Sequence, residues 1–246
     1  KVIEDPQTDI IIELIGGEQQ FITKLDTLFS TSSDLVGDQI SSDISGLIGQ
    51  YAHGNEPSHH MAYLYNFVNK PSKTQEKIYQ ILTELYKNDP DGVSGNEDCG
   101  QMSAWYVLSS LGFYPVTPGA NQYIIGSPLF EKATINLENK KQFTIQAENI
   151  SDSAIYIEKA FLNDIALNRT FITHNEIIAG GILKFYMTDA PTNWGTQEGQ
   201  EPKTEIKEHL IIPTPFIAEG EIAFKNDTQV SLANSIKETT IYEPCL

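Results

Sequence analysis

Apolar residues recur at helical spacing through the first half of the chain. Over Thr8–Gly112 they lie three and four positions apart, the period of one buried helix face. Gly16-Gly17 ends the first such segment, Pro57 fits the first turn of the third, and Pro71 breaks that third helix. Ser72 is the expected N-cap of the fourth. The segments expected to be helical are 8–15, 21–29, 57–70, 72–87 and 101–111. Together they predict an antiparallel helical array.

After Tyr123 the pattern changes to short runs in which apolar and polar residues alternate. Alternation with a period of two is typical of a strand with one buried face. The runs are 133–137, 143–147, 154–157 and 182–187. Strand-sized runs at this spacing predict an antiparallel sandwich that follows the helices. Residues 192–204 have the composition of a linker, and two further strand-like runs, 221–224 and 229–232, come after it.

These patterns predict an α+β chain of more than one domain. We expect a helical portion over 1–120 and a β-sandwich portion over 121–196. The remainder, 197–246, reads as a linker and the start of a further β domain. Only about 40 residues follow the linker, few for an independently stable domain, so we expect that domain to be truncated.

The composition is that of a folded protein with an acidic surface. Hydrophobic residues make up 40% of the 246 residues and the mean hydropathy is −0.27, which excludes both a membrane protein and a disordered chain. The formal net charge of −17 repels phosphate backbones and no basic patch offsets it, so we expect no nucleic-acid partner. The acidity fits a neutral sugar or a bound cation, and equally a solvated acidic surface.

Neither the cysteines nor the start of the chain defines a compartment. Cys99 and Cys245 are too far apart for a disulfide framework or a metal knuckle. No segment approaches the ~18 consecutive apolar residues of a membrane span. The sequence begins at Lys1 with neither Met nor a secretory signal, so we expect a mature or truncated fragment.

Two polar loops carry more functional groups than turns require. They are His53-Gly-Asn-Glu-Pro-Ser-His-His60 and Gly95-Asn-Glu-Asp-Cys-Gly-Gln101, and each lies just before an apolar helix. A helix N-cap needs one short polar side chain, whereas these loops offer five candidates. The five are Asn55, Glu56, Asn96, Glu97 and Asp98. We therefore expect both loops to point side chains into one pocket, while the alternative is a pair of capped, solvated loops.

The oxygen-rich loops indicate a hard cation more than a zinc ion. Calcium takes six to eight oxygen ligands from carboxylates, amides, carbonyls and water, and these loops supply that type of ligand. His53, Glu56, His59 and His60 superficially match zinc-protease spacing. Zinc is disfavoured because Pro57 starts the helix after His53, which leaves the histidines off a common helix face.

Four motifs, in order along the chain, resemble the glycoside hydrolases of family 92. They are the segments 53–60, 95–106, 112–115 and 126–128, and the resemblance covers residues 8–196. It implies a calcium-dependent, inverting exo-α-mannosidase built from an (α/α)6 barrel and β-sandwich portions. An inverting enzyme needs one acid for the leaving oxygen and a separate carboxylate that activates water.

The resemblance assigns the base half of such a site to the second loop. Asp98 matches the catalytic base of the family. Asn96 stands where some members have a second Asp, which puts a base-assisting role there in doubt. Glu97 would assist the metal or the water, or would be an exposed loop carboxylate.

The first loop matches the calcium-binding segment. Asn55 and Glu56 are the implied Ca2+ ligands, with the ion holding mannose hydroxyl groups. His59 and His60 are candidate sugar-contacting donors, or hydrogen-bonded wall residues. Trp105 is a candidate sugar platform, although its helical spacing also fits a core residue.

The remaining expectations concern what lies outside the two loops. The family's general acid falls upstream of Lys1, and none of Glu4, Glu13 and Glu18 sits in a motif that carries it. The partners implied are a mannose-containing glycan, with α-1,2 linkages favoured, and the missing N-terminal part of the same enzyme. A secreted or periplasmic location is likewise implied by the resemblance. The alternative is a non-catalytic carbohydrate-binding or calcium-stabilised accessory domain.

Overall fold

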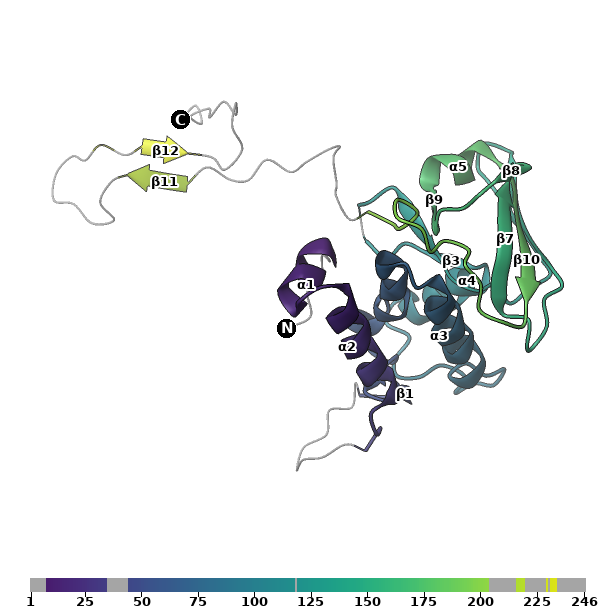
Figure 1. Ribbon diagram of the computed structural model, residues 1–246, viewed down its shortest axis with the longest axis horizontal. Helices are drawn as coiled ribbons and strands as arrows, with labels where there is room; N and C mark the ends of the chain where they lie inside the picture. Colours follow the sequence, from purple (N-terminus) through teal and green to yellow (C-terminus); the bar gives the residue numbers. More distant parts are fainter. Residues whose placement is uncertain are drawn as a thin grey trace. The chain divides into compact units, whose positions relative to one another are not determined.

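The computed structural model describes residues 8–34, 44–117, 119–203, 216–219, 229 and 231–233. The chain divides into two compact units, Lys1–Glu205 and Ile206–Leu246, and each is described by itself. In the first unit most of the helices gather on one side and the long strands on the other (Figure 1). The expected α+β composition is therefore present within a single unit.

Four of the five expected helices are confirmed as α-helices (Figure 1). They are α1 Thr8–Ile15, α2 Glu18–Ser30, α3 Pro71–Glu84 and α4 Gln101–Ser110. A short hairpin lies between α2 and α3, formed by β1 Leu47–Ile48 and β2 Tyr51–Ala52. It leads into the first of the two polar loops.

The prediction of an α-helix over 57–70 is wrong, because this segment forms two 3-10 helices. They are η1 Glu56–Ser58 and η2 Met61–Val68. All residues of η2 after Met61 are buried, so its packing surface is not one helical stripe. The tighter 3-10 helix eclipses side chains at i and i+3, and it stops at Asn69, which has a left-handed φ of 54°.

Pro71 and Ser72 also have roles other than those predicted. Lys70 is the N-cap of α3 and Pro71 occupies its first turn, so Pro71 begins this helix. A proline costs nothing there because the first N–H groups of a helix have no intrahelical acceptor. The Ser72 hydroxyl instead lies 3.5 Å from the Thr192 carbonyl oxygen.

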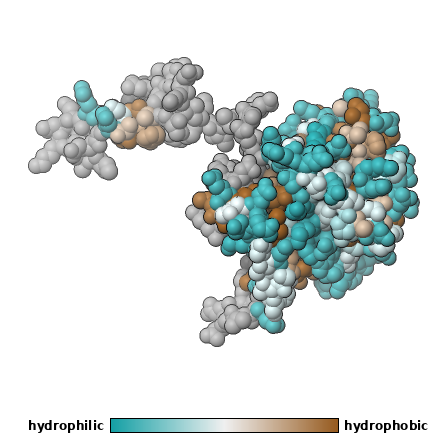
Figure 2. All heavy atoms as spheres, in the orientation of Figure 1, coloured by the Kyte–Doolittle hydropathy of each residue, from teal (hydrophilic) through white to brown (hydrophobic). Residues whose placement is uncertain are grey.

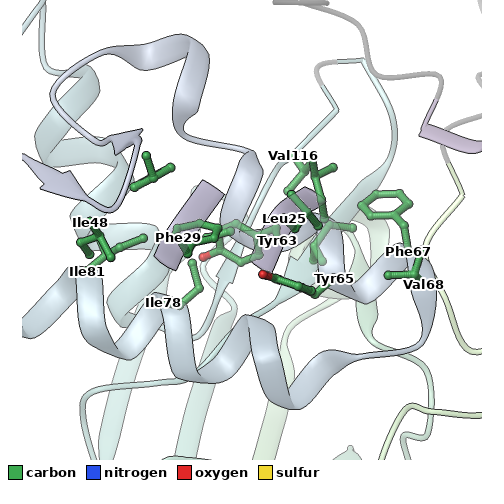
Figure 3. Close-up of a cluster of buried hydrophobic side chains, with 14 of the residues drawn as sticks. Leu25, Phe29, Ile48, Tyr63, Tyr65, Phe67, Val68, Ile78, Ile81 and Val116 are labelled. Carbon is green, nitrogen blue, oxygen red and sulfur yellow. The ribbon is translucent and has the colours of Figure 1, made fainter. Parts of the chain in front are cut away.

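The helical side of the first unit encloses one hydrophobic core. Figure 3 shows side chains from α2, η2 and α3 turned toward one another. Its labelled members are Leu25, Phe29, Ile48, Tyr63, Tyr65, Phe67, Val68, Ile78, Ile81 and Val116. The Tyr65 hydroxyl donates to Asp26, which also pairs with Lys73 at 2.7 Å, so α2, η2 and α3 share polar as well as apolar contacts.

The strand-rich side contains a five-stranded sheet in the order β5-β6-β10-β7-β8. Its strands are β5 Lys132–Asn136, β6 Gln142–Glu148, β7 Tyr156–Leu162, β8 Ile165–Ala166 and β10 Gly181–Thr188. The alternating pattern correctly located β5, β6 and β10, while β7 begins two residues later than expected and is longer. The all-antiparallel prediction is wrong because β6 and β10 are parallel, with Phe143 opposite Gly181. The chain makes a crossover through β7, β8 and α5 between them.

A smaller antiparallel sheet lies next to α4 along the chain. It consists of β3 Phe113–Tyr114, β4 Gln122–Ile125 and β9 Phe171–Thr173. Helix α5, His174–Ala179, follows β9 and starts with a capping box in which Thr173 and Glu176 each bind the other's backbone N–H. Sequence periodicity missed these elements because each is only a few residues long.

Hydrogen bonds between buried groups join the helices to the sheets. The Gln75 side chain on α3 accepts from the Ile157 N–H on β7 at 3.1 Å. On η2, the Asn66 amide donates to the Ile125 carbonyl at 2.8 Å. The predicted boundary at residue 120 thus separates elements that belong to one compact unit.

The prediction of a linker over 192–204 is wrong for its described part, 192–203, which packs against the first unit. Trp194 is buried and its indole N–H donates to the Leu167 carbonyl at 2.7 Å. The Gln200 carbonyl accepts from both the N–H and the hydroxyl of Thr170. Turn residues gave this segment a linker composition, but its aromatic anchor and backbone hydrogen bonds fix it in place.

The described part of the second unit is a pair of antiparallel strands, β11 Phe216–Glu219 and β12 Ser231–Ala233. β12 overlaps the strand-like run expected at 229–232. The expected strand at 221–224 lies outside the described residues, as do Glu4 and Cys245.

The surface is mainly hydrophilic on the face drawn in Figure 2, with apolar colour gathered over α1 and over the α5 end of the sheet. Leu14 on α1 is 80% exposed and Ile165 on β8 is 73% exposed. Within the described ranges, no helix has both the length and the apolar character needed to cross a membrane.

Candidate active site

The two polar loops lie against each other because glycines let their backbones touch. Gly95 has a φ of 76°, and a Cβ atom on it would lie 2.7 Å from the Gly54 carbonyl oxygen. A Cβ on Gly54 would in turn lie 3.2 Å from the Ser94 carbonyl oxygen. Side chains at these positions would force the loops apart, so glycine determines their close approach.

Asp98 projects from a turn of unusual backbone geometry at the start of α4. Asp98, Cys99 and Gly100 have φ values of 47°, 58° and 92°, so three consecutive residues are left-handed. Non-glycine residues avoid this region because Cβ crowds the carbonyl oxygen. Strained residues of this kind cluster at functional sites. All of Asn96–Cys99 is exposed, so the turn presents its side chains to solvent.

The carboxyl groups of Asp98 and Glu56 meet across the two loops. The pKa of Asp98 is raised, first by a side-chain hydrogen bond with Glu56, then by desolvation and by repulsion from the Glu56 charge. Two carboxyl groups that share a hydrogen bond cannot both ionise freely unless a cation compensates their charge. The structure therefore brings together the predicted base and the best predicted metal ligand.

The donor groups of the first loop fit a calcium ion in type. Asn55 is the N-cap residue of η1, but its side chain makes no capping hydrogen bond. Its amide oxygen and the Glu56 carboxylate are hard oxygen donors, the kind that calcium prefers. Within the described ranges no group of three or more His, Cys, Asp or Glu side chains is placed to hold a metal ion.

His53 is a buried structural residue in this structure. Its ring nitrogens contact the Tyr51 hydroxyl at 2.8 Å and the Tyr86 hydroxyl at 2.6 Å. Burial, with a smaller effect of the neighbouring His59, lowers the pKa of His53 to about 3. The Tyr86 hydroxyl also lies 3.3 Å from the Met102 carbonyl, so Tyr86 links the first loop to α4.

His59 and Trp105 lie beneath the two loops. The His59 ring contacts the His53 carbonyl at 3.0 Å through Nε2 and the Gln101 amide at 3.3 Å through Nδ1. The Trp105 indole N–H donates to the His59 carbonyl at 3.0 Å, and both side chains are buried. His59 is therefore a hydrogen-bonded wall residue and Trp105 is a core residue. Because both side chains are buried, neither is placed to contact a sugar directly. Burial lowers the pKa of His59 to about 4.

His60 points to a different part of the molecule. It lines a mainly apolar cavity of about 570 Å3 between α1, α2 and the start of η2, together with Met61 and Leu64. Burial lowers its pKa as well. His60 thus lies apart from His53 and His59, whose ring centroids are 4.8 Å from each other.

Two residues that organise the site were not singled out from the sequence. Gln101 donates to the Tyr114 hydroxyl at 3.0 Å and contacts His59, so it joins α4, β3 and the first loop. It lies inside a recognised motif, so the motif was the available signal. Tyr86, which follows α3, had none, because its role depends on which loop packs against it.

Comparison with known proteins assigns the chain to a family. The Glycosyl hydrolase family 92 catalytic domain matches residues 2–189. A family GH92 alpha-mannosidase of Bacteroides thetaiotaomicron, solved with mannoimidazole, is 40% identical with a TM-score of 0.72, over 76% of this chain and 24% of that one. A family GH92 inverting mannosidase from the same organism is 38% identical with a TM-score of 0.67, over 78% of this chain and 27% of that one.

A curated relative extends the comparison to a fungus. It is an uncharacterized secreted glycosidase of Arthroderma benhamiae, 27% identical over 195 residues, which are 78% of this chain and 23% of the relative. The chain therefore belongs to glycosyl hydrolase family 92 and spans about a quarter of the length of these relatives.

Proposed function

We propose that this chain carries the catalytic-base half of a calcium-dependent, inverting exo-α-mannosidase, with Asp98 as the general base. The observation that carries the proposal is the meeting of Asp98 and Glu56 across two loops of a family 92 chain. Asp98 is exposed on a strained turn, where its carboxylate can reach a water molecule. The neighbours described as alpha-mannosidases support α-mannosides as the substrate class.

Inversion assigns different roles to the two carboxylates that meet. In an inverting glycosidase the acid and the base lie ~6.5–9.5 Å apart, because a water molecule must fit between the base and the sugar. Glu56 is within hydrogen-bonding reach of Asp98 and is therefore too close to be the acid. The general acid belongs elsewhere, outside the residues that this chain contributes to the site.

Glu56 and Asn55 are the residues of this chain that would hold calcium. When bound, the ion would supply positive charge and fix the sugar hydroxyls. Asp98 would accept the proton of the attacking water as the water oxygen bonds to the anomeric carbon and the glycosidic oxygen leaves. The Glu56 carboxylate would help to hold that water molecule and the sugar in the correct relative position.

The finer features are proposals of the same kind. We propose that the helices form part of an (α/α)6 barrel and the strands part of a sandwich. The natural substrates would be terminal mannosides of glycans, with α-1,2 linkages favoured, and the location secreted or periplasmic. A relative described as secreted supports the last point. His60 lines a separate, mainly apolar cavity, so the proposed mannose contacts do not include it.

Proton NMR of the first-formed product tests the mechanism. With a 2,4-dinitrophenyl α-mannoside, whose leaving group needs no acid, inversion gives β-mannose before mutarotation. Asp98→Asn should lower the rate by ~10²–10⁴-fold and leave mannose binding intact, because removing a general base affects the chemical step. First appearance of α-mannose would contradict inversion. Mannose binding without turnover by the unmodified chain would indicate a carbohydrate-binding module instead.

A further inference from the structure

Helix α4 begins without a side chain at its N-cap. The N-cap residue is Gly100, with a left-handed φ of 92°, and it has no side chain to accept a helix N–H. The first N–H groups of a helix lack intrahelical acceptors and need other partners. In α4 these partners come from the residues just before it.

The Glu97 carboxylate takes the place of the missing cap. Its Oε1 accepts from the Ser103 N–H at 3.2 Å and its Oε2 accepts from the Ser103 hydroxyl at 3.0 Å. A negative charge at this position also complements the positive end of the helix dipole. Both carboxylate oxygens are thus directed at α4.

The backbone of Glu97 and Asp98 completes the first turn. The Met102 N–H donates to the Glu97 carbonyl at 3.3 Å, and the Gln101 N–H donates to the Asp98 carbonyl at 3.2 Å. Glu97 is therefore fixed to α4 by both its main chain and its side chain. The three left-handed residues, Asp98 to Gly100, lie between Glu97 and the helix.

We propose that Glu97 is a positioning residue, whose carboxylate clamps the first turn of α4 and thereby holds the left-handed turn that directs Asp98 toward Glu56. This inference rests on the proposed function of Asp98. It replaces the expectation that Glu97 assists the metal or the water, because Ser103 engages both of its oxygens. A relaxed turn would move the Asp98 carboxylate without removing it.

The thiol of Cys99 offers a direct report on this turn. Cys99 is exposed and lies next to Asp98, and the full sequence has one other cysteine, Cys245. In a Cys245→Ser background, a trifluoromethyl label on Cys99 gives a fluorine NMR signal that is sensitive to turn conformation. The variants are Glu97→Ala and Glu97→Gln, with Glu138→Ala as the matched removal of an exposed carboxylate elsewhere.

The clamp predicts different results for the two Glu97 variants. Glu97→Ala should split or broaden the fluorine signal, whereas Glu97→Gln should keep one signal, since an amide still bonds to both groups of Ser103. With the activated mannoside, Glu97→Ala should lower kcat at least tenfold with KM within twofold. Glu97→Gln should stay within about threefold of the unmodified chain, as a conservative rescue, and Glu138→Ala should match the unmodified chain.

Three results would overturn the proposal. One is an unchanged fluorine signal in Glu97→Ala. The second is an equal loss of kcat in both Glu97 variants, which would indicate a charge-dependent role in the chemistry. The third is a tenfold rise in the calcium concentration that turnover needs, which would indicate a role at the metal. The fluorine NMR experiment needs no turnover. It therefore tests whether Glu97 holds the turn even if the chain is not a mannosidase.

Discussion

At the scale of single residues, burial separates the groups that support the site from those that can react. Asp98 is exposed, while His53 and His59 are buried and bonded to protein groups. The ordinary histidine pKa of about 6.5 falls to about 3 and about 4 respectively, because burial disfavours the charged ring. The histidines of this loop are therefore expected to act as neutral supports.

This burial predicts a pH dependence of stability. A histidine whose pKa is lower in the folded state adds stability above pH 6.5, and that stability is lost as pH falls toward the folded pKa. The free energy of unfolding should thus fall between about pH 6.5 and pH 4, by ~1.4 kcal/mol per pH unit for each of the two histidines. Urea denaturation across this range measures it, with His53→Gln removing one contribution.

The exposed His174 supplies the control for that experiment. His174→Gln should leave the pH dependence of the unfolding free energy nearly as it is in the unmodified chain. A His53→Gln variant whose stability still falls as steeply below pH 6.5 would contradict the assignment of His53 as a buried neutral residue.

The glycine contact between the two loops gives a second prediction at this scale. Gly95→Ala places a Cβ against the Gly54 carbonyl, whereas Gly199, which also has a positive φ, has open space around it. Both substitutions should cost ~1–2 kcal/mol of stability, because alanine is strained in the left-handed backbone conformation. Gly95→Ala should cost a further ~1–3 kcal/mol from the clash, and it should also separate Glu56 from Asp98.

Thermal denaturation and turnover of the two glycine variants measure this difference. Gly95→Ala should lose activity as well as stability, while Gly199→Ala should lose only a little stability. Equal effects of the two substitutions would mean that the loops do not depend on the close approach of their backbones.

At the scale of elements, sequence periodicity worked where one face of an element is buried. Helices α1 to α4 and strands β5, β6 and β10 were located to within a few residues. It failed for η2, which is buried nearly all round, and for β8 and β9, which are too short to show a period. The parallel pairing of β6 with β10 joins segments far apart in the chain, which local patterns cannot show.

The same distinction applies to the candidate site. Asp98 and Glu56 were identified because they lie in long motifs whose residue types match the chemistry. Tyr86 and Gln101 were not singled out, because their contacts with His53 and His59 exist only after the elements pack. The helix-capping role of Glu97 likewise depends on the geometry of Ser103.

The packed segment 192–203 gives a prediction about an element that composition misassigned. Trp194 buries its ring and binds the Leu167 carbonyl, so Trp194→Ala should cost ~3–5 kcal/mol of stability. Phe130→Ala, at a half-exposed aromatic residue, is the matched control and should cost far less. Urea unfolding measures both. A Trp194→Ala variant as stable as the unmodified chain would restore the linker interpretation.

At the scale of the whole molecule, the chain matches the family 92 catalytic domain over residues 2–189. It spans about a quarter of the solved relatives, yet it contains both polar loops and the helices that support them. On the proposed function, the base and the calcium ligands of this chain would lie in one compact unit, and the general acid would come from outside the residues that build this site. If the general acid is missing, the rate of hydrolysis should depend strongly on how easily the leaving group departs without a proton.

The most direct test compares hydrolysis of 2,4-dinitrophenyl α-mannoside with hydrolysis of unactivated α-1,2-mannobiose. We predict turnover of the activated substrate only, because a nitrophenolate leaves without an acid, and we predict its loss with EDTA and with Asp98→Ala. Asp189→Ala, at another exposed carboxylate, is the control. Undiminished turnover by Asp98→Ala, or no turnover by a folded chain that also fails to bind calcium, would contradict the assignment of the base half to this chain.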